Sequence, residues 1–259
     1  MKRISFIFFM CVLSLSRNLC AQEGWKQHQA EHFIIYYKNA PADFVGTVEE
    51  MAELYYKEIT ENLGFTRYKN WTFDRRAKVY ICDDKEDYIQ TAVQAGWSHG
   101  VAFLQKKEIL TYPAAHGFFD STLPHELGHI IFREFIGFNS QIPLWLDEGV
   151  AMFQEKAKRW GANKIVKKAI KENKFIPLAE LAKIRLDRNT PEDIVELFYA
   201  ESASVVYYMV TDLGQHRFVR LCREINKGES FEAALRAVYL RFKNVDDLNR
   251  NWIKYLENE

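Results

Sequence analysis

The pentapeptide HELGH at residues 125–129 constrains this chain more than any other feature of its sequence. On a helix, positions i and i+4 lie on one face, so His125 and His129 can point at one metal ion. Leu, Ile and Phe flank the pentapeptide, which predicts a largely buried helix over residues 121–135. Two histidines and an acid are costly inside such a helix unless they have partners. The pattern therefore favours a zinc site, and an amphipathic helix with two incidental surface histidines is the alternative.

A second segment offers a third ligand. The sequence LWLDEGVA begins at residue 144 and predicts another helix over residues 144–158, after a break at Gly137. We expect this helix to pack back on the first, so that Glu148 completes a two-histidine, one-glutamate site for one zinc ion per chain. Glu126 lies next to His125 but on another side of the helix. We therefore predict that it is the general base that activates the attacking water molecule.

The pattern of strands and helices changes along the chain. HFIIYYK at 32–38, AKVYIC at 77–82 and two short strands within 100–112 predict a small sheet, together with helices at 41–64 and 84–94. From residue 121 onward the periodicity predicts helix after helix. The further predicted helices are 163–172, 178–184, 191–213, 218–225, 231–240 and 245–256. We therefore expect an α+β fold, with a mixed lobe over 22–120, a helical lobe over 121–259 and the active site at their interface.

The first residues are typical of an export signal. Lys2 and Arg3 precede an apolar stretch over residues 4–15, which is too short to span a bilayer comfortably. We expect cleavage after Ala21, so that residues 1–21 are a signal peptide and the mature protein is periplasmic or extracellular, without stable membrane insertion. A lipoprotein attached through Cys20 and an uncleaved anchor are the alternatives.

The charge balance and the cysteines limit which binding partners and which metal sites the chain can have. Lys+Arg and Asp+Glu are both 35, so the chain has no excess of basic residues that would indicate binding to nucleic acid. Cys82 and Cys222 remain after removal of the signal peptide, and they form either one disulfide or two buried thiols. Neither has a CxxC partner, which excludes a cysteine zinc site.

HELGH followed by LWLDEGVA resembles the gluzincin metallopeptidases, the group that includes thermolysin and aminopeptidase N. The mature chain is also similar to the peptidase MA-like domains of bacterial exported proteins. The resemblance implies a zincin-like fold and zinc-dependent hydrolysis of peptide bonds in a peptide or protein substrate. Thermolysin-like enzymes carry an aspartate four residues after the ligand glutamate, which supports a histidine. Met152 stands at that position here, so another acceptor must orient the ring nitrogens.

The resemblance also implies a role for a segment that begins at Tyr199. The sequence YAESASVV is similar to the helix in which aminopeptidase N-like enzymes place an oxyanion-stabilising tyrosine, which assigns that role to Tyr199; a core tyrosine is the alternative. Residues 100–103 (GVAF) match the position of a substrate-pairing edge strand, or form an ordinary strand of the sheet. Because this segment has no glutamate to bind a free amine, we expect an endopeptidase. His99 and His116 are further candidates for an acid or substrate-binding role.

Two other functions remain open at this stage. The first is a zinc-binding, catalytically idle domain that recognises a peptide or protein partner, which the departures at Met152 and Gly100 keep open. The second is a hydrolase that uses the same zinc centre on a non-peptide substrate. The presence of Glu126 favours an enzyme, because a domain that only binds has no need for a base beside the metal.

Overall fold

The computed structural model describes residues 24–65, 71–92, 100–113, 117–187 and 189–259. The expected signal peptide, His99 and His116 lie outside these residues. The chain divides into two compact units, of which the first comprises Met1–Lys57 and Lys69–Glu126 and the second Glu58–Tyr68 and Leu127–Glu259. Two of the three boundaries between the units fall within continuous helices, α1 (Ala42–Leu63) and α3 (Leu123–Ile136).

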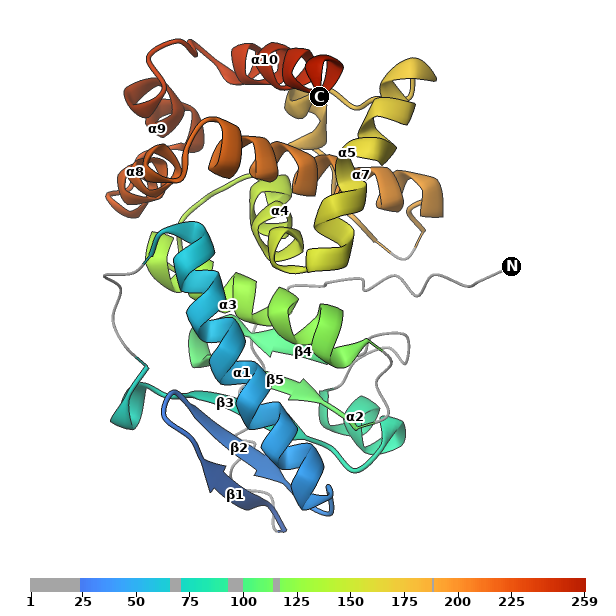
Figure 1. Cartoon of the computed structure of the whole chain (residues 1–259), viewed down its shortest axis with the longest axis vertical. Helices are drawn as coiled ribbons and strands as arrows, with labels where there is room; N and C mark the ends of the chain where they lie inside the picture. Colours follow the sequence, from blue (N-terminus) through green and yellow to red (C-terminus); the bar gives the residue numbers. More distant parts are fainter. Residues whose placement is uncertain (1–23, 66–70, 93–99, 114–116, 188) are drawn as a thin grey trace. The chain divides into compact units, whose positions relative to one another are not determined.

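The first unit contains a five-stranded sheet with the order β1-β2-β3-β5-β4 (Figure 1). The two inner pairs, β2 with β3 and β3 with β5, are parallel, whereas the outer pairs are antiparallel. The short strand β4 is therefore one edge of the sheet. The strands are β1 (Lys26–Gln29), β2 (Phe33–Tyr37), β3 (Ala77–Ile81), β4 (Gly100–Phe103) and β5 (Glu108–Thr111).

The sequence explains the inner strands. In β2, Phe33 and Ile35 are fully buried and alternate with more exposed neighbours, as the period of two predicts. All of β5 is buried, which suits an inner strand of a mixed sheet. The two short strands predicted within 100–112 are β4 and β5, and they form a hairpin with Lys107 in the left-handed region at φ 53° in its turn. Helix α2 (Lys85–Ala92) follows β3 near its predicted place.

The second unit is almost entirely helical, so the α+β prediction is confirmed (Figure 1). Besides most of α3, its longer helices are α4 (Leu144–Gln154), α5 (Lys156–Lys171), α7 (Glu192–Tyr207), α8 (Gln215–Asn226), α9 (Phe231–Val238) and α10 (Val245–Asn258), with a short α6 (Leu178–Leu181). Two predicted helix boundaries are wrong. The helix expected over 144–158 ends at Gln154, and the helix expected to begin at residue 163 instead begins at Lys156 and runs through Gly161.

Helix α4 packs closely on α7 in this unit. A Cβ atom on Gly149 would lie only 2.3 Å from the backbone oxygen of Ser202, so the glycine permits an approach that no other residue allows. The shared core is large and aromatic, and it includes Trp145, Phe198 and Trp252. Glycine at position 149 therefore determines how near α4 lies to α7.

The two cysteines are both free and buried, in agreement with the buried-thiol alternative. Burial, helped by the charge of Asp87, raises the pKa of the Cys82 thiol to about 12, and burial raises that of Cys222 as well. Both thiols are therefore unreactive at neutral pH. Within the described residues, no helix combines the length and apolar character needed to cross a membrane.

Candidate metal centre

Helix α3 carries the HELGH pentapeptide. A π-helical turn over Phe118–Thr122 precedes it, and Gly117 opens that turn with a left-handed φ of 76°. The helix is buried along most of its length, because His125, Glu126 and His129 are all inaccessible together with their apolar neighbours. The predicted burial of this helix is thus confirmed, and its three polar side chains lie in an environment where they need partners.

Helix α4 brings the third side chain. It begins directly after Pro143, and every residue from Trp145 to Gln154 is buried, Glu148 included. The approach to α3 is close, since a Cβ atom on Gly128 would lie 3.1 Å from the Cα of Ala151. Because Gly128 has no side chain, α3 and α4 can lie close enough for residues of both helices to reach one ion.

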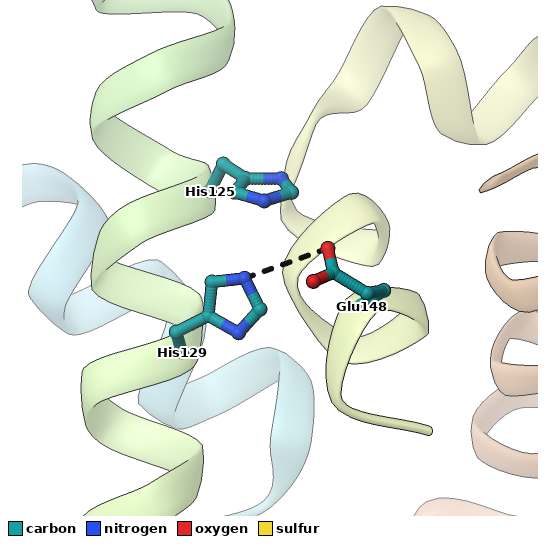
Figure 2. A group of neighbouring side chains, drawn as sticks. All are labelled: His125, His129 and Glu148. Atoms are coloured by element: carbon teal, nitrogen blue, oxygen red, sulfur yellow. Dashed lines mark ion pairs between the residues drawn. The ribbon is translucent and has the colours of Figure 1, made fainter. Parts of the chain in front are cut away.

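The structure brings His125, His129 and Glu148 together (Figure 2). One ligand atom of each lies within 4.8 Å of the others, and Nε2 of His129 lies 3.7 Å from Oε2 of Glu148. Two ligands of a tetrahedral zinc ion with bonds of about 2.0–2.1 Å are separated by about 3.4 Å. Two imidazole nitrogens and one carboxylate oxygen are also a donor set that zinc uses in catalytic sites. The cluster fits a zinc ion by geometry and by chemistry.

A family model described as the Peptidase MA superfamily matches residues 69–258. The chain belongs to this superfamily. Peptidase MA domains are typically zinc-dependent, in keeping with the cluster on α3 and α4. No curated protein matches the chain significantly.

In this Peptidase MA domain, His129 forms a hydrogen bond with Asp147, an acid that the sequence prediction did not identify. Asp147 lies one residue before Glu148, and its Oδ1 is 3.2 Å from Nδ1 of His129. Arg133, one turn after His129 on α3, donates to Oδ2 of Asp147 from Nε at 2.9 Å and from Nη2 at 2.7 Å. Burial would raise the pKa of Asp147, but His129 and Arg133 lower it to about 2. Asp147 is therefore a buried carboxylate at neutral pH.

This arrangement sets the tautomer of His129. A carboxylate only accepts hydrogen bonds, so Nδ1 carries the proton and Nε2 offers its lone pair toward Glu148. Arg133 also donates from Nη1 to the backbone oxygen of Ser140 at 2.9 Å, which ties the α3–α4 loop to the same group. Ser140 in turn donates to the backbone oxygen of Ile136 at 2.6 Å, at the end of α3. The loop, the acid and the histidine are thus held as one network.

Glu126 and Tyr199, the two residues with expected catalytic roles, lie on different helices. Glu126 follows His125 on α3 and is fully buried. Tyr199 is buried on α7, three residues before Ser202, whose backbone meets Gly149 of α4. Positions three apart share a helix face, so Tyr199 lies on the face of α7 that is directed at α4. The alternative of a core tyrosine keeps support from the edge-on contact of its ring with Phe198, at 5.6 Å between centroids.

The acceptor that orients His129 was missing from the sequence prediction. That prediction considered position 152, where Met152 is a buried apolar residue of α4. The signal was adjacent instead, because an aspartate directly before the ligand glutamate lies in the first turn of the same helix. Its partner Arg133 lies one turn after His129 on α3. The opposite charges of Asp147 and Arg133 therefore indicate a pair once the positions of both helices are known.

Proposed function

We propose that this protein is an exported zinc-dependent endopeptidase, with one zinc ion held by His125, His129 and Glu148. A single observation carries the proposal. In a Peptidase MA domain, three buried ligand atoms from two closely packed helices lie within 4.8 Å of one another. Glu126 follows His125 in the sequence and is buried, and its proposed role as the general base adds support, because a domain that only binds metal does not need one.

The residues of this chain divide the chemistry. Zinc, when bound, supplies a Lewis acid that polarises the scissile carbonyl and acidifies a water molecule. Glu126 accepts a proton from the attacking water and returns it to the leaving amine. Asp147 and Arg133 keep His129 in the tautomer that offers Nε2 to the ion. Burial of the whole group strengthens each of these electrostatic interactions.

Tyr199 is proposed to stabilise the carbonyl oxygen as it becomes negatively charged. A tyrosine hydroxyl is a suitable donor for such an oxygen, and one well-placed donor of this kind contributes about 10²–10³ in rate. Support comes from the position of Tyr199 on the α4-directed face of α7, next to the close contact between Gly149 and Ser202.

The edge strand β4 is proposed to bind the substrate backbone. Among the described residues, β4 pairs with β5 at one edge of the sheet, and an edge strand is where an extended peptide can add to a sheet. A Cβ atom on Gly100 would lie 2.5 Å from Cγ2 of Thr122, so β4 begins against the residue that precedes α3. An extended peptide paired with β4 would start beside the helix of His125. The sequence GVAF offers it no carboxylate for a free amine, which favours an endopeptidase.

The first test pairs metal content with proteolysis. Wild-type protein, Glu148→Ala and the exposed control Glu229→Ala are purified under zinc-replete conditions, and their zinc is measured by elemental analysis. We expect one zinc per chain in wild type and control, and its loss or weakening in Glu148→Ala. Chelator-sensitive cleavage of casein by wild type and control supports the proposal, and metal-free wild-type protein contradicts it.

Two further variants separate the catalytic roles from metal binding. Glu126→Gln keeps the size of the side chain and removes the base, so we expect bound zinc with casein cleavage reduced by at least about 10³-fold. Tyr199→Phe should keep zinc and lose about 10²-fold in turnover. Full turnover in Tyr199→Phe would restrict that residue to the core. Zinc binding without cleavage of casein or of a peptide library by wild type would instead support the catalytically idle domain.

Export is proposed on the sequence of residues 1–21 alone. Mass spectrometry of the protein secreted by a Gram-negative host measures it directly. A mature N-terminus at Gln22 is expected, and an acylated Cys20 at the N-terminus would indicate the lipoprotein.

A further inference from the structure

Helix α5 concentrates positive charge in a chain that has none in excess. Its sixteen residues, KAKRWGANKIVKKAIK, include seven Lys or Arg and no Asp or Glu. The whole chain carries 35 basic and 35 acidic residues. A helix of this composition repels itself electrostatically, since like charges at i and i+4 destabilise it. The composition of α5 is therefore electrostatically unfavourable for the helix itself.

The exposed lysines of α5 form one stripe. Lys164, Lys168 and Lys171 recur at steps of four and three residues and are all exposed, so they lie along a single helix face. The opposite face is apolar and buried, and it packs against α7 within the same unit (Figure 1). The charged face is therefore fixed toward solvent by the packing of the other.

A hollow of about 720 Å³ follows this stripe. The three exposed lysines line it together with Lys167, and Ile165 contributes an apolar patch that is 37% exposed. Volumes of this size hold small ligands or a few residues of a peptide. We call this feature the lysine hollow.

One carboxylate already occupies an end of the lysine hollow. Asn163 donates to Oε2 of Glu259 at 2.6 Å, and Nζ of Lys167 lies 3.5 Å from the same oxygen. Lys168 has only a distant partner, Glu172 at 3.8 Å, and both side chains are exposed. Among the described residues, Lys164 and Lys171 form no ion pair. In the lysine hollow, Asn163 and Lys167 thus bind one carboxylate, and Lys164 and Lys171 could bind further carboxylates.

We propose that the lysine hollow binds an acidic segment of a partner protein. The donors already hold a carboxylate, and a row of ammonium groups beside one apolar side chain matches a segment in which Asp or Glu flank an apolar residue. An anionic membrane fits less well, because the surface is hollowed and, among the described residues that line it, Ile165 is the one apolar side chain. The proposal does not depend on peptide hydrolysis, since α5 carries none of the residues assigned to the metal centre.

Binding of a fluorescein-labelled oligoglutamate peptide by fluorescence anisotropy tests the proposal. The variant Lys164→Glu/Lys171→Glu reverses the two unpaired charges, and Lys85→Glu/Lys243→Glu makes the same change of net charge at exposed lysines elsewhere. We expect the first pair to weaken binding by about tenfold or more at low ionic strength, and the control pair by less than about twofold. Equal weakening by both pairs, or no binding by wild type, would overturn the proposal.

A second comparison works in the opposite direction. Glu259→Gln removes the carboxylate that occupies Asn163 and Lys167, so we expect the peptide to bind about twofold to threefold more tightly. Glu257→Gln makes the same charge change at an exposed position nearby and should leave affinity unchanged. Equal affinities for these two variants would argue against binding in the hollow. Lysine-dependent binding to phosphatidylglycerol vesicles, without binding to the peptide, would replace the acidic protein segment with a lipid surface.

Discussion

Two buried acids of the helical unit have pKa values that are shifted in opposite directions. Asp147 on α4 is 4% exposed and Glu201 on α7 is fully buried. Both oxygens of Asp147 have strong partners, in His129 and Arg133. Glu201 accepts one hydrogen bond at Oε1 from the backbone of Ile176, at 2.9 Å, while Oε2 has no partner among the described residues.

Burial acts on both acids in the same direction, so their partners decide the difference in charge between them. Burial disfavours the ionised form at both positions. At Asp147 the neighbouring His129 and Arg133 overcome it and lower the pKa to about 2. At Glu201 the single backbone bond does not, and burial raises the pKa to about 8. Helix α4 thus presents an anion to His129, whereas helix α7 uses a neutral acid to hold the segment before α6.

Removal of the acid at the metal centre should have the largest effect. Asp147→Ala leaves Arg133 without its carboxylate and His129 without its acceptor, and breaking a buried ion pair in this way costs about 4 kcal/mol. We expect that loss in the free energy of unfolding of the metal-free protein, measured by urea denaturation with EDTA. Zinc affinity, measured by competition with a chromophoric chelator, should fall about 10–100-fold.

The matched variant Asp147→Asn separates charge from hydrogen bonding. Its amide oxygen still accepts from Nδ1 of His129, but it gives Arg133 no opposite charge. We expect zinc affinity near that of wild type together with a loss of stability smaller than in Asp147→Ala. If Asp147→Asn and Asp147→Ala bind zinc equally weakly, the charge of Asp147 acts on the metal site and the tautomer is not the main cause.

The contact that joins the two helices should give the next largest effect. Gly149→Ala places a methyl group 2.3 Å from the backbone oxygen of Ser202, and backbone cannot move aside as a flexible side chain can. We expect a loss of about 3 kcal/mol in urea denaturation. Gly161→Ala on α5 is the control, because no atom lies within 4 Å of the added Cβ and the helix gains propensity. Equal stability of both variants would contradict the close packing of α4 on α7.

Much of the metal centre could be predicted from sequence because it is written in local patterns. HELGH determines which two histidines share a helix face, and the break after Ile136 predicts that Glu148 returns to them. The alternation in β2 and the apolar run in β3 likewise predicted their strands correctly. These features depend on residues close together in the chain, where periodicity is informative.

Other features depend on distant partners, and the sequence did not reveal them. Strand β1 reads KQHQ, a polar sequence, and it forms through its pairing with β2. The end of α4 at Gln154 has no glycine or proline signal, since Glu155 follows and α5 begins at once. The link from Asp147 to Arg133 crosses between helices. In each case tertiary contacts, which local propensity does not contain, decide the outcome.

The neutral acid on α7 predicts a pH-dependent stability. A carboxyl with the ordinary pKa of 4.5 releases its proton in the unfolded chain well before folded Glu201 does, near pH 8. The folded state therefore binds more protons across this window, and its stability falls as pH rises from about 4.5 to about 8. Glu201→Gln removes this loss, so we expect it to be about 2 kcal/mol more stable than wild type at pH 8.5 and nearly equal at pH 4.5.

Urea denaturation at the two pH values measures the effect, with Glu196→Gln as the control at an exposed position on the same helix. The control should not change the pH dependence. A gain in Glu201→Gln that is the same at both pH values would mean that the carboxyl has no raised pKa in the folded protein.

The smallest effect is expected from a change that keeps the charge beside Asp147 and alters only its shape. Arg133→Lys retains one cation but loses the paired donors to Asp147 and the third donor to Ser140. Because a lysine cannot reproduce that fork, we expect a loss of about 1 kcal/mol and a fewfold lower zinc affinity. Arg220→Lys, at an exposed position on α8, should change neither. If Arg133→Lys were as damaging as Asp147→Ala, the geometry of the guanidinium, and not its charge, would be what keeps the buried aspartate ionised and in place.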